Sequence, residues 1–126
     1  MSGQRTRYAL AALVVFAIEV VIALYLNDAV IRPYLGDSLA VAFVYLLLRA
    51  ALPVRAPLAA GVAFAIACAI EVGQAFHLVD RIGLGHSRVA RVLFGTHYDP
   101  RDFVAYAIGA VTVLLAEGAI AAYRRR

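Results

Sequence analysis

Four long apolar segments dominate the chain and restrict the folds that are open to it. They occupy residues 8–26, 38–53, 57–79 and 102–123. A helix of about 20 residues crosses the roughly 30 Å hydrocarbon core of a bilayer, and only the second segment is short by that measure. Backbone polar groups within a bilayer must be hydrogen-bonded inside the segment, which favours helices. Since 64% of the residues are hydrophobic, the sequence predicts an all-α membrane protein, a bundle of four transmembrane helices.

The composition also restricts the domain organisation and the partners. No linker rich in Ser, Gly or Pro divides the sequence, which predicts a single integral-membrane domain over residues 1–126. All twelve basic residues are arginines, and they cluster at the ends of the apolar segments, where arginine contacts lipid head groups. The lipid bilayer is therefore the predicted partner, and nucleic acid is not.

The arginines are distributed unevenly between the two sides of the predicted bundle. The side that contains both termini has seven arginines and no acidic residue: Arg5, Arg7, Arg49, Arg55 and Arg124–Arg126. The other side has five arginines, interleaved with aspartates: Arg32, Arg81, Arg88, Arg91 and Arg101. Because basic residues in short loops favour the cytoplasmic side, this imbalance predicts that both termini are cytoplasmic.

The second predicted outer loop contains a further helical pattern. In "GHSRVARVLFG", residues 85–95, the apolar side chains share one side of a helix, and Arg88 and Arg91 lie on another. An apolar face beside a basic one is typical of a helix that lies in the membrane interface. We therefore expect a short interfacial helix in this loop.

A polar flank interrupts the third apolar segment near its end. Glu71, Gln74 and His77 follow one another at intervals of three residues, which places them within a sector of about 120° on a helix. Ala60 and Ala63 fall in the same sector, and small residues allow helices to approach closely in lipid. Because polar groups within a membrane are costly unless they face protein or water, we expect this flank to point into the bundle.

The fourth apolar segment offers a matching face. Asp102, Ala105, Tyr106 and Gly109 fall within one stripe, and the last of these completes a small-x-x-x-small spacing that is typical of packed transmembrane helices. Asp99 precedes the segment and suits a helix N-cap. The sequence therefore predicts that the third and fourth segments pack with their polar residues facing each other.

The sequence offers little sign of a metal, a cofactor or a known catalytic motif. No pair of His or Cys residues has a recognised ligand spacing, so we predict neither a metal nor a cofactor. No G-x-S-x-G is present. Whether the protein is an enzyme is left open, with Glu71 as the candidate general base and His77 or Asp102 as candidates to assist it.

Three motifs resemble a known group of proteins. They are "IRPYLGD" (31–37), "EVGQAFH" (71–77) and "LFGTHYDPRDFVAYAIGA" (93–110). Together they resemble a bacterial family of small integral-membrane proteins of unknown function, which is similar to the VanZ-like proteins. The resemblance extends from about residue 8 to 120 and implies a four-span, multi-pass protein of the bacterial inner membrane, concerned with the cell envelope. The family pattern marks Arg32, Pro33, Asp37, Glu71, Gln74, His77, Asp102, Tyr106 and Gly109, and it implies no reaction.

These observations together predict a polar pocket in the outer half of the bundle. Its expected binding residues are Arg32, Asp37, Glu71, Gln74, His77, Asp102 and Tyr106. Carboxylates, a cationic rim and apolar walls suit the head group of an amphiphilic envelope ligand, such as a lipid-linked precursor. Two alternatives remain: an accessory subunit of a larger membrane complex, which would have a membrane-protein partner, and a membrane-embedded enzyme that uses Glu71 as its general base.

Overall fold

The fold is known from a computed structural model, which describes residues 3–25, 31–76, 78–83, 86–87 and 99–125. Within the helices, the side chains of residues 31–33 and 78–79 are not described. The helices are α1 (Gly3–Tyr25), α2 (Ile31–Ala51), α3 (Ala56–Ala75), the short α4 (Leu78–Arg81) and α6 (Asp102–Arg124). Four of them are long and apolar enough to cross a membrane. This result confirms the predicted all-helical membrane fold. The expected interfacial helix over 85–95 falls almost entirely outside the described residues.

Two helices begin before the apolar segments that predict them, whereas α2 ends at Ala51 and α3 at Ala75, before the predicted residues 53 and 79. α1 begins at Gly3 and α2 at Ile31, whereas the corresponding apolar segments start at residues 8 and 38. Pro33 lies in the first turn of α2, where the missing N–H costs nothing because that turn has no intrahelical acceptor for it. Hydropathy detects the part of a helix that suits hydrocarbon and does not detect polar turns at its ends.

A tight connection joins α2 to α3. The residues from Leu52 to Arg55 lie outside both helices, and Pro57 occupies the first turn of α3. The amide of Leu52 still donates to the carbonyl of Leu48, and that of Ala59 donates to the carbonyl of Arg55, so the last and first turns are closed. A connection this short makes α2 and α3 antiparallel neighbours.

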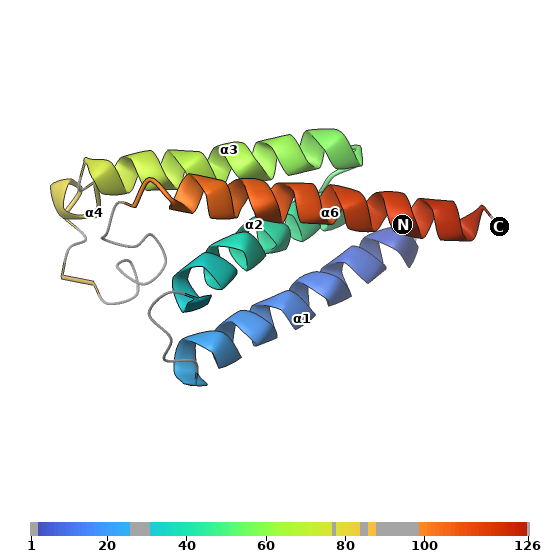
Figure 1. Ribbon diagram of the computed structural model, residues 1–126, viewed down its shortest axis with the longest axis horizontal. Coiled ribbons are helices and arrows are strands. Elements are labelled where there is room, and N and C mark those ends of the chain that lie inside the picture. The colour runs from blue at the N-terminus through green and yellow to red at the C-terminus, as the bar shows by residue number, and fades with distance from the viewer. Residues whose placement is uncertain (1–2, 26–30, 77, 84–85, 88–98, 126) are drawn as a thin grey trace.

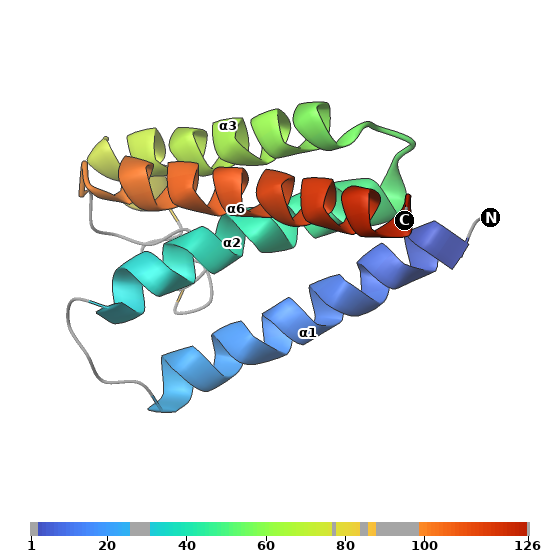
Figure 2. The same cartoon turned by 45° about the vertical axis from the view of Figure 1, so that its right-hand side comes forward.

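The four long helices run up and down, with α2 at the centre of the packing. α2 contacts α1, α3 and α6, α3 also contacts α6, and α1 packs chiefly on α2. The N- and C-terminal ends of the chain lie at the same end of the bundle (Figure 1 and Figure 2). We call this the terminal end, where α1 and α3 begin and α2 and α6 end. The opposite end, where α2 and α6 begin, is the loop end.

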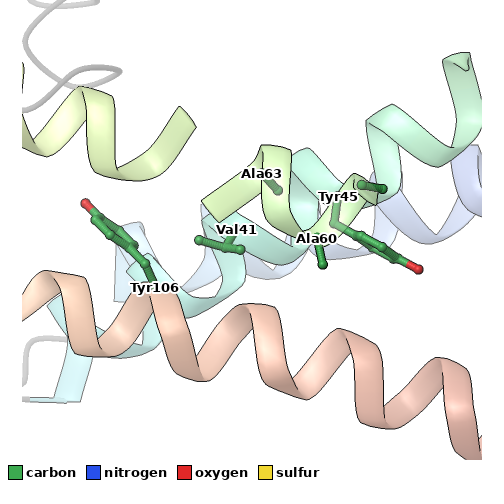
Figure 3. Packing of buried hydrophobic residues seen from close by; sticks show 6 residues of the cluster. Val41, Tyr45, Ala60, Ala63 and Tyr106 are labelled. Carbon is green, nitrogen blue, oxygen red and sulfur yellow. The ribbon is translucent and has the colours of Figure 1, made fainter. Parts of the chain in front are cut away.

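The buried core is narrow and consists largely of small residues. Its members are Val41 and Tyr45 from α2, Ala59, Ala60 and Ala63 from α3, and Tyr106 from α6. Figure 3 shows the hydroxyl groups of the two tyrosines pointing in opposite directions. Large apolar side chains lie mostly outside, with Leu115 69% exposed and Leu24 67% exposed. This inverted distribution suits a bundle whose outer surface faces lipid and whose helices associate through close packing.

α2 and α6 approach each other closely at Gly109. A Cβ atom added to Gly109 would lie 2.5 Å from the carbonyl oxygen of Ser38. The Ser38 hydroxyl donates a hydrogen bond of 2.8 Å to the carbonyl of Ala105, one turn earlier on α6. The small-x-x-x-small face predicted for the fourth segment therefore packs against α2, and the absence of a side chain at Gly109 sets the distance.

Candidate functional site

Acidic side chains from three helices meet at the loop end. Asp37 comes from the first part of α2, Glu71 from the last part of α3 and Asp102 from the start of α6. Because α2 and α6 begin where α3 ends, residues far apart in the sequence reach the same region. We define the loop-end cluster as these three residues together with Asp99 and Tyr106.

Glu71 is the most deeply buried member of the cluster. Its side chain is fully buried, and it is the only charged residue that is buried in the described chain. Its Oε1 accepts a hydrogen bond of 2.9 Å from the Tyr106 hydroxyl, and its Oε2 accepts one of 2.7 Å from the Asp99 backbone N–H. Buried polar groups normally have such partners. Glu71 thus ties the start of α6 to α3, and the expectation that the flank points inward is met at Glu71.

The remaining carboxyl groups contact one another. The Asp102 carboxyl group is within hydrogen-bonding reach of those of Asp37 and Glu71. A carboxylate can only accept, so a hydrogen bond between two carboxyl groups requires a proton on one of them. Adjacent negative charges also repel strongly where the surroundings are apolar. A proton shared between these carboxyl groups would therefore stabilise the cluster.

A further carboxyl group approaches from α1. Glu19 lies close enough to Asp37 for the two charges to interact. Its Oε1 is buried and has no hydrogen-bond partner among the described residues. A buried acceptor without a donor is costly, which marks this part of the bundle as a place where a proton or a donor group would bind favourably.

The rim of the cluster is polar and more accessible. Asp99 accepts hydrogen bonds through Oδ1 from the Arg101 backbone N–H at 2.9 Å and through Oδ2 from the Tyr34 hydroxyl at 3.2 Å. The Arg101 guanidinium also reaches Asp99 at 3.3 Å and lies 5.8 Å from the centre of the Tyr34 ring. The Arg101 amide is the main reason that the pKa of Asp99 is lowered. The predicted N-cap role of Asp99 is wrong, because α6 has Arg101 as its N-cap without a side-chain cap hydrogen bond, and Asp99 instead accepts from the Arg101 N–H in the turn before the helix.

The structure brings together most of the binding residues predicted from the sequence. Asp37, Glu71, Asp102 and Tyr106 form one cluster, and Gln74 is half-buried on the next turn of α3. His77 and the side chain of Arg32 lie outside the described residues, so the predicted cationic rim stays a prediction. Tyr34 and Ser38 were not predicted, although both lie on the face of α2 that carries Asp37. Among the described residues, no acidic, His or Cys group is arranged to hold a metal ion.

A second polar cluster, at the terminal end, was not predicted. Glu117 Oε2 accepts hydrogen bonds from the hydroxyls of Tyr8 at 2.6 Å and Tyr45 at 2.7 Å. Arg49 donates to the Tyr8 hydroxyl at 2.8 Å and lies 3.6 Å from Glu117. These four residues, the terminal-end cluster, connect α1, α2 and α6. The i, i+4 spacing of Tyr45 and Arg49 indicates that the two side chains lie on one face of α2. It does not identify Tyr8 and Glu117 as their partners, because these come from other helices.

Comparison with known proteins identifies one family. Residues 26–110 match the family described as "Protein of unknown function (DUF2809)". The matched range contains α2, α3 and the start of α6, and therefore every member of the loop-end cluster. No curated protein and no solved structure matches the chain. The family description mentions neither VanZ-like proteins nor bacteria, so both remain predictions from the sequence motifs.

Proposed function

The chain belongs to the DUF2809 family of proteins of unknown function, and from that premise we propose that it binds an amphiphilic ligand of the cell envelope. In this proposal the ligand's polar head group occupies the loop-end cluster. The observation that supports it is the convergence of carboxyl groups from three helices at one end of the bundle. The protein would act in the bacterial cytoplasmic membrane, as the resemblance to VanZ-like proteins implies.

The chemistry of the cluster favours a head group that donates hydrogen bonds. The two oxygens of Glu71 have donors within the protein, whereas Asp37 and Asp102 contact each other. Both aspartates are half-buried, so a ligand at the loop end can reach them. A hydroxyl or ammonium group placed between them would supply donors and would relieve the repulsion between neighbouring carboxylates.

The surroundings of the cluster suit the apolar part of such a ligand. On the outward face of α6, Val104 is 61% exposed and Ile108 is 56% exposed, directly after Asp102 in the helix. Residues two and six positions apart on a helix point to different sides, so these side chains face lipid on the side of α6 away from Asp102. A ligand held by its head group at Asp102 would therefore have its tail in the surrounding hydrocarbon.

The alternative of an enzyme that uses Glu71 as its general base receives less support. A general base must reach the proton that it removes, within hydrogen-bonding distance. Glu71 is fully buried, and both of its oxygens already accept hydrogen bonds from Tyr106 and Asp99. This geometry favours a positioning role for Glu71. Asp102 is the more accessible carboxyl group and the better candidate for contact with a ligand.

Mass spectrometry of the intact protein, purified in mild detergent, tests the proposed binding. We expect the wild type to carry a discrete amphiphile, and Asp102→Asn to retain roughly tenfold less of it, as the loss of one charge-assisted hydrogen bond predicts. Asp80→Asn is the control, because Asp80 is exposed on α4 at the same end. Equal retention by both variants would contradict the proposal. A stoichiometric protein bound in place of an amphiphile would favour the accessory subunit.

The orientation of the bundle can be tested separately. We expect a reporter that is active only outside the cytoplasm to be inactive at the C-terminus and active when inserted between His86 and Ser87. The reason is the excess of arginine at the terminal end. The reverse pair of activities would place the loop-end cluster on the cytoplasmic side and remove the argument for a ligand of the outer leaflet.

A further inference from the structure

A largely apolar cavity lies near the terminal end, away from the loop-end cluster. It has a volume of about 420 Å³ and is open on one side, between α1 and α6 with α2 beneath. Three alanines, one from each helix, make room for it: Ala11, Ala42 and Ala116. The cavity exists because α1 packs chiefly on α2 and has little contact with α6. In both cartoon views the first turns of α1 and the last turns of α6 lie at the same end (Figure 1 and Figure 2).

The walls of this groove are apolar, and its one acidic group is already neutralised. Val15, Val113 and Ile120 contribute much of the lining. Glu117 also lines it, but its Oε2 accepts hydrogen bonds from two tyrosine hydroxyls and faces the Arg49 guanidinium. The groove therefore presents a surface suited to hydrocarbon, without an uncompensated negative charge.

The mouth of the groove is positively charged. Arg7 from α1 and Arg124 from α6 both line it, and both side chains are exposed. Neither forms an ion pair with an acidic side chain of the described residues. Arg5 and Arg49, by contrast, are engaged within the bundle, the first with the carbonyls of Ala50 and Ala51. Two arginines thus remain available at the point where the groove opens toward the head-group region.

We propose that this groove binds one acyl chain of an anionic phospholipid, whose phosphate is held by Arg7 and Arg124. Basic pockets between transmembrane helices bind anionic head groups, and an arginine guanidinium matches phosphate geometry. The apolar walls would contact the acyl chain, and the two arginines would neutralise the negative charge of the phosphate. A bound chain would fill the space between α1 and α6 and connect α1 to the rest of the bundle. This site is independent of the ligand proposed for the loop end.

The test uses the full chain in detergent, titrated with phosphatidylglycerol or with phosphatidylcholine of identical acyl chains. Intact-protein mass spectrometry measures the fraction that carries each lipid. We expect a preference for phosphatidylglycerol that falls roughly thirtyfold in Arg7→Gln/Arg124→Gln, because the loss of each arginine near the head groups weakens the binding of an anionic lipid by a similar factor. The control, Arg55→Gln/Arg125→Gln, removes two exposed arginines from the same end that do not line the groove, and it should keep the preference.

A second variant tests the groove without changing the charge. Ala116→Phe fills the space from α6, where the native side chain is exposed, and it should lower the binding of both lipids while thermal unfolding in detergent stays cooperative. Equal binding of the two lipids by the wild type would overturn the proposal. So would an equal loss in the two arginine double variants, or full lipid binding by Ala116→Phe. Asp102→Asn should leave this lipid in place, which separates the site from the one at the loop end.

Discussion

Gly109→Ala is expected to destabilise the bundle, although alanine is the better helix former. The added methyl group would lie 2.5 Å from the Ser38 carbonyl oxygen, which belongs to the backbone and cannot turn aside. α2 and α6 would have to separate, which would weaken the hydrogen bond from Ser38 to Ala105. Overpacking of this kind costs about 1–3 kcal/mol, more than the gain of roughly 1 kcal/mol in helix propensity. Gly109→Leu should prevent accumulation of the folded protein. Thermal unfolding in detergent measures the first effect, and the yield of folded protein measures the second.

Two substitutions on α6 provide matched controls for Gly109. A Cβ atom at Gly118 would meet nothing within 4 Å, so Gly118→Ala should be neutral or slightly stabilising. Val111 is 53% exposed, and Val111→Leu should also be tolerated. If Gly109→Ala unfolds at the same temperature as Gly118→Ala, the close approach of α2 and α6 does not determine stability.

Glu71→Leu is expected to lower the free energy of unfolding by as much as Gly109→Ala or by more. Glu71→Gln, in contrast, should largely preserve the fold. Leucine would leave the Asp99 amide and the Tyr106 hydroxyl without their acceptor. Each buried group that loses its partner costs about 1–3 kcal/mol, which gives roughly 2–6 kcal/mol for the two. The free energy of unfolding in detergent is the quantity to measure.

Glutamine can replace the carboxylate because the tyrosine hydroxyl can reverse its role. The amide oxygen would accept from the Asp99 N–H, and the amide nitrogen would donate to the Tyr106 hydroxyl, which is able to accept. Tyr106→Phe removes only one of the two donors and should therefore cost less than Glu71→Leu. If glutamine proves as damaging as leucine, the negative charge itself, and not the pair of hydrogen bonds, holds α6 against α3.

The contrast between the two clusters explains which polar residues a sequence can reveal. Glu71 was recognised because a carboxyl group inside an apolar segment is costly and therefore conspicuous. Glu117 and Arg49 lie close to the ends of their segments, where charged residues are ordinary, and the sequence gives no reason to connect them. Their contact depends on α1, α2 and α6 meeting at the terminal end, and in particular on the two tyrosine hydroxyls that share one oxygen of Glu117.

The sequence by itself determined the class of the protein, the inward position of Glu71 and the small-residue face of α6. These follow from hydropathy and helical periodicity, which are local properties of the chain. Only the tertiary structure decided which helix each face meets: Gly109 packs on α2, while Glu71 of α3 holds the residues that lead into α6. The groove between α1 and α6 likewise depends on α1 packing chiefly on α2. In lipid, apolar helix surfaces gain little from one partner over another, so helix order depends on close steric fit and a few hydrogen bonds, which periodicity does not encode.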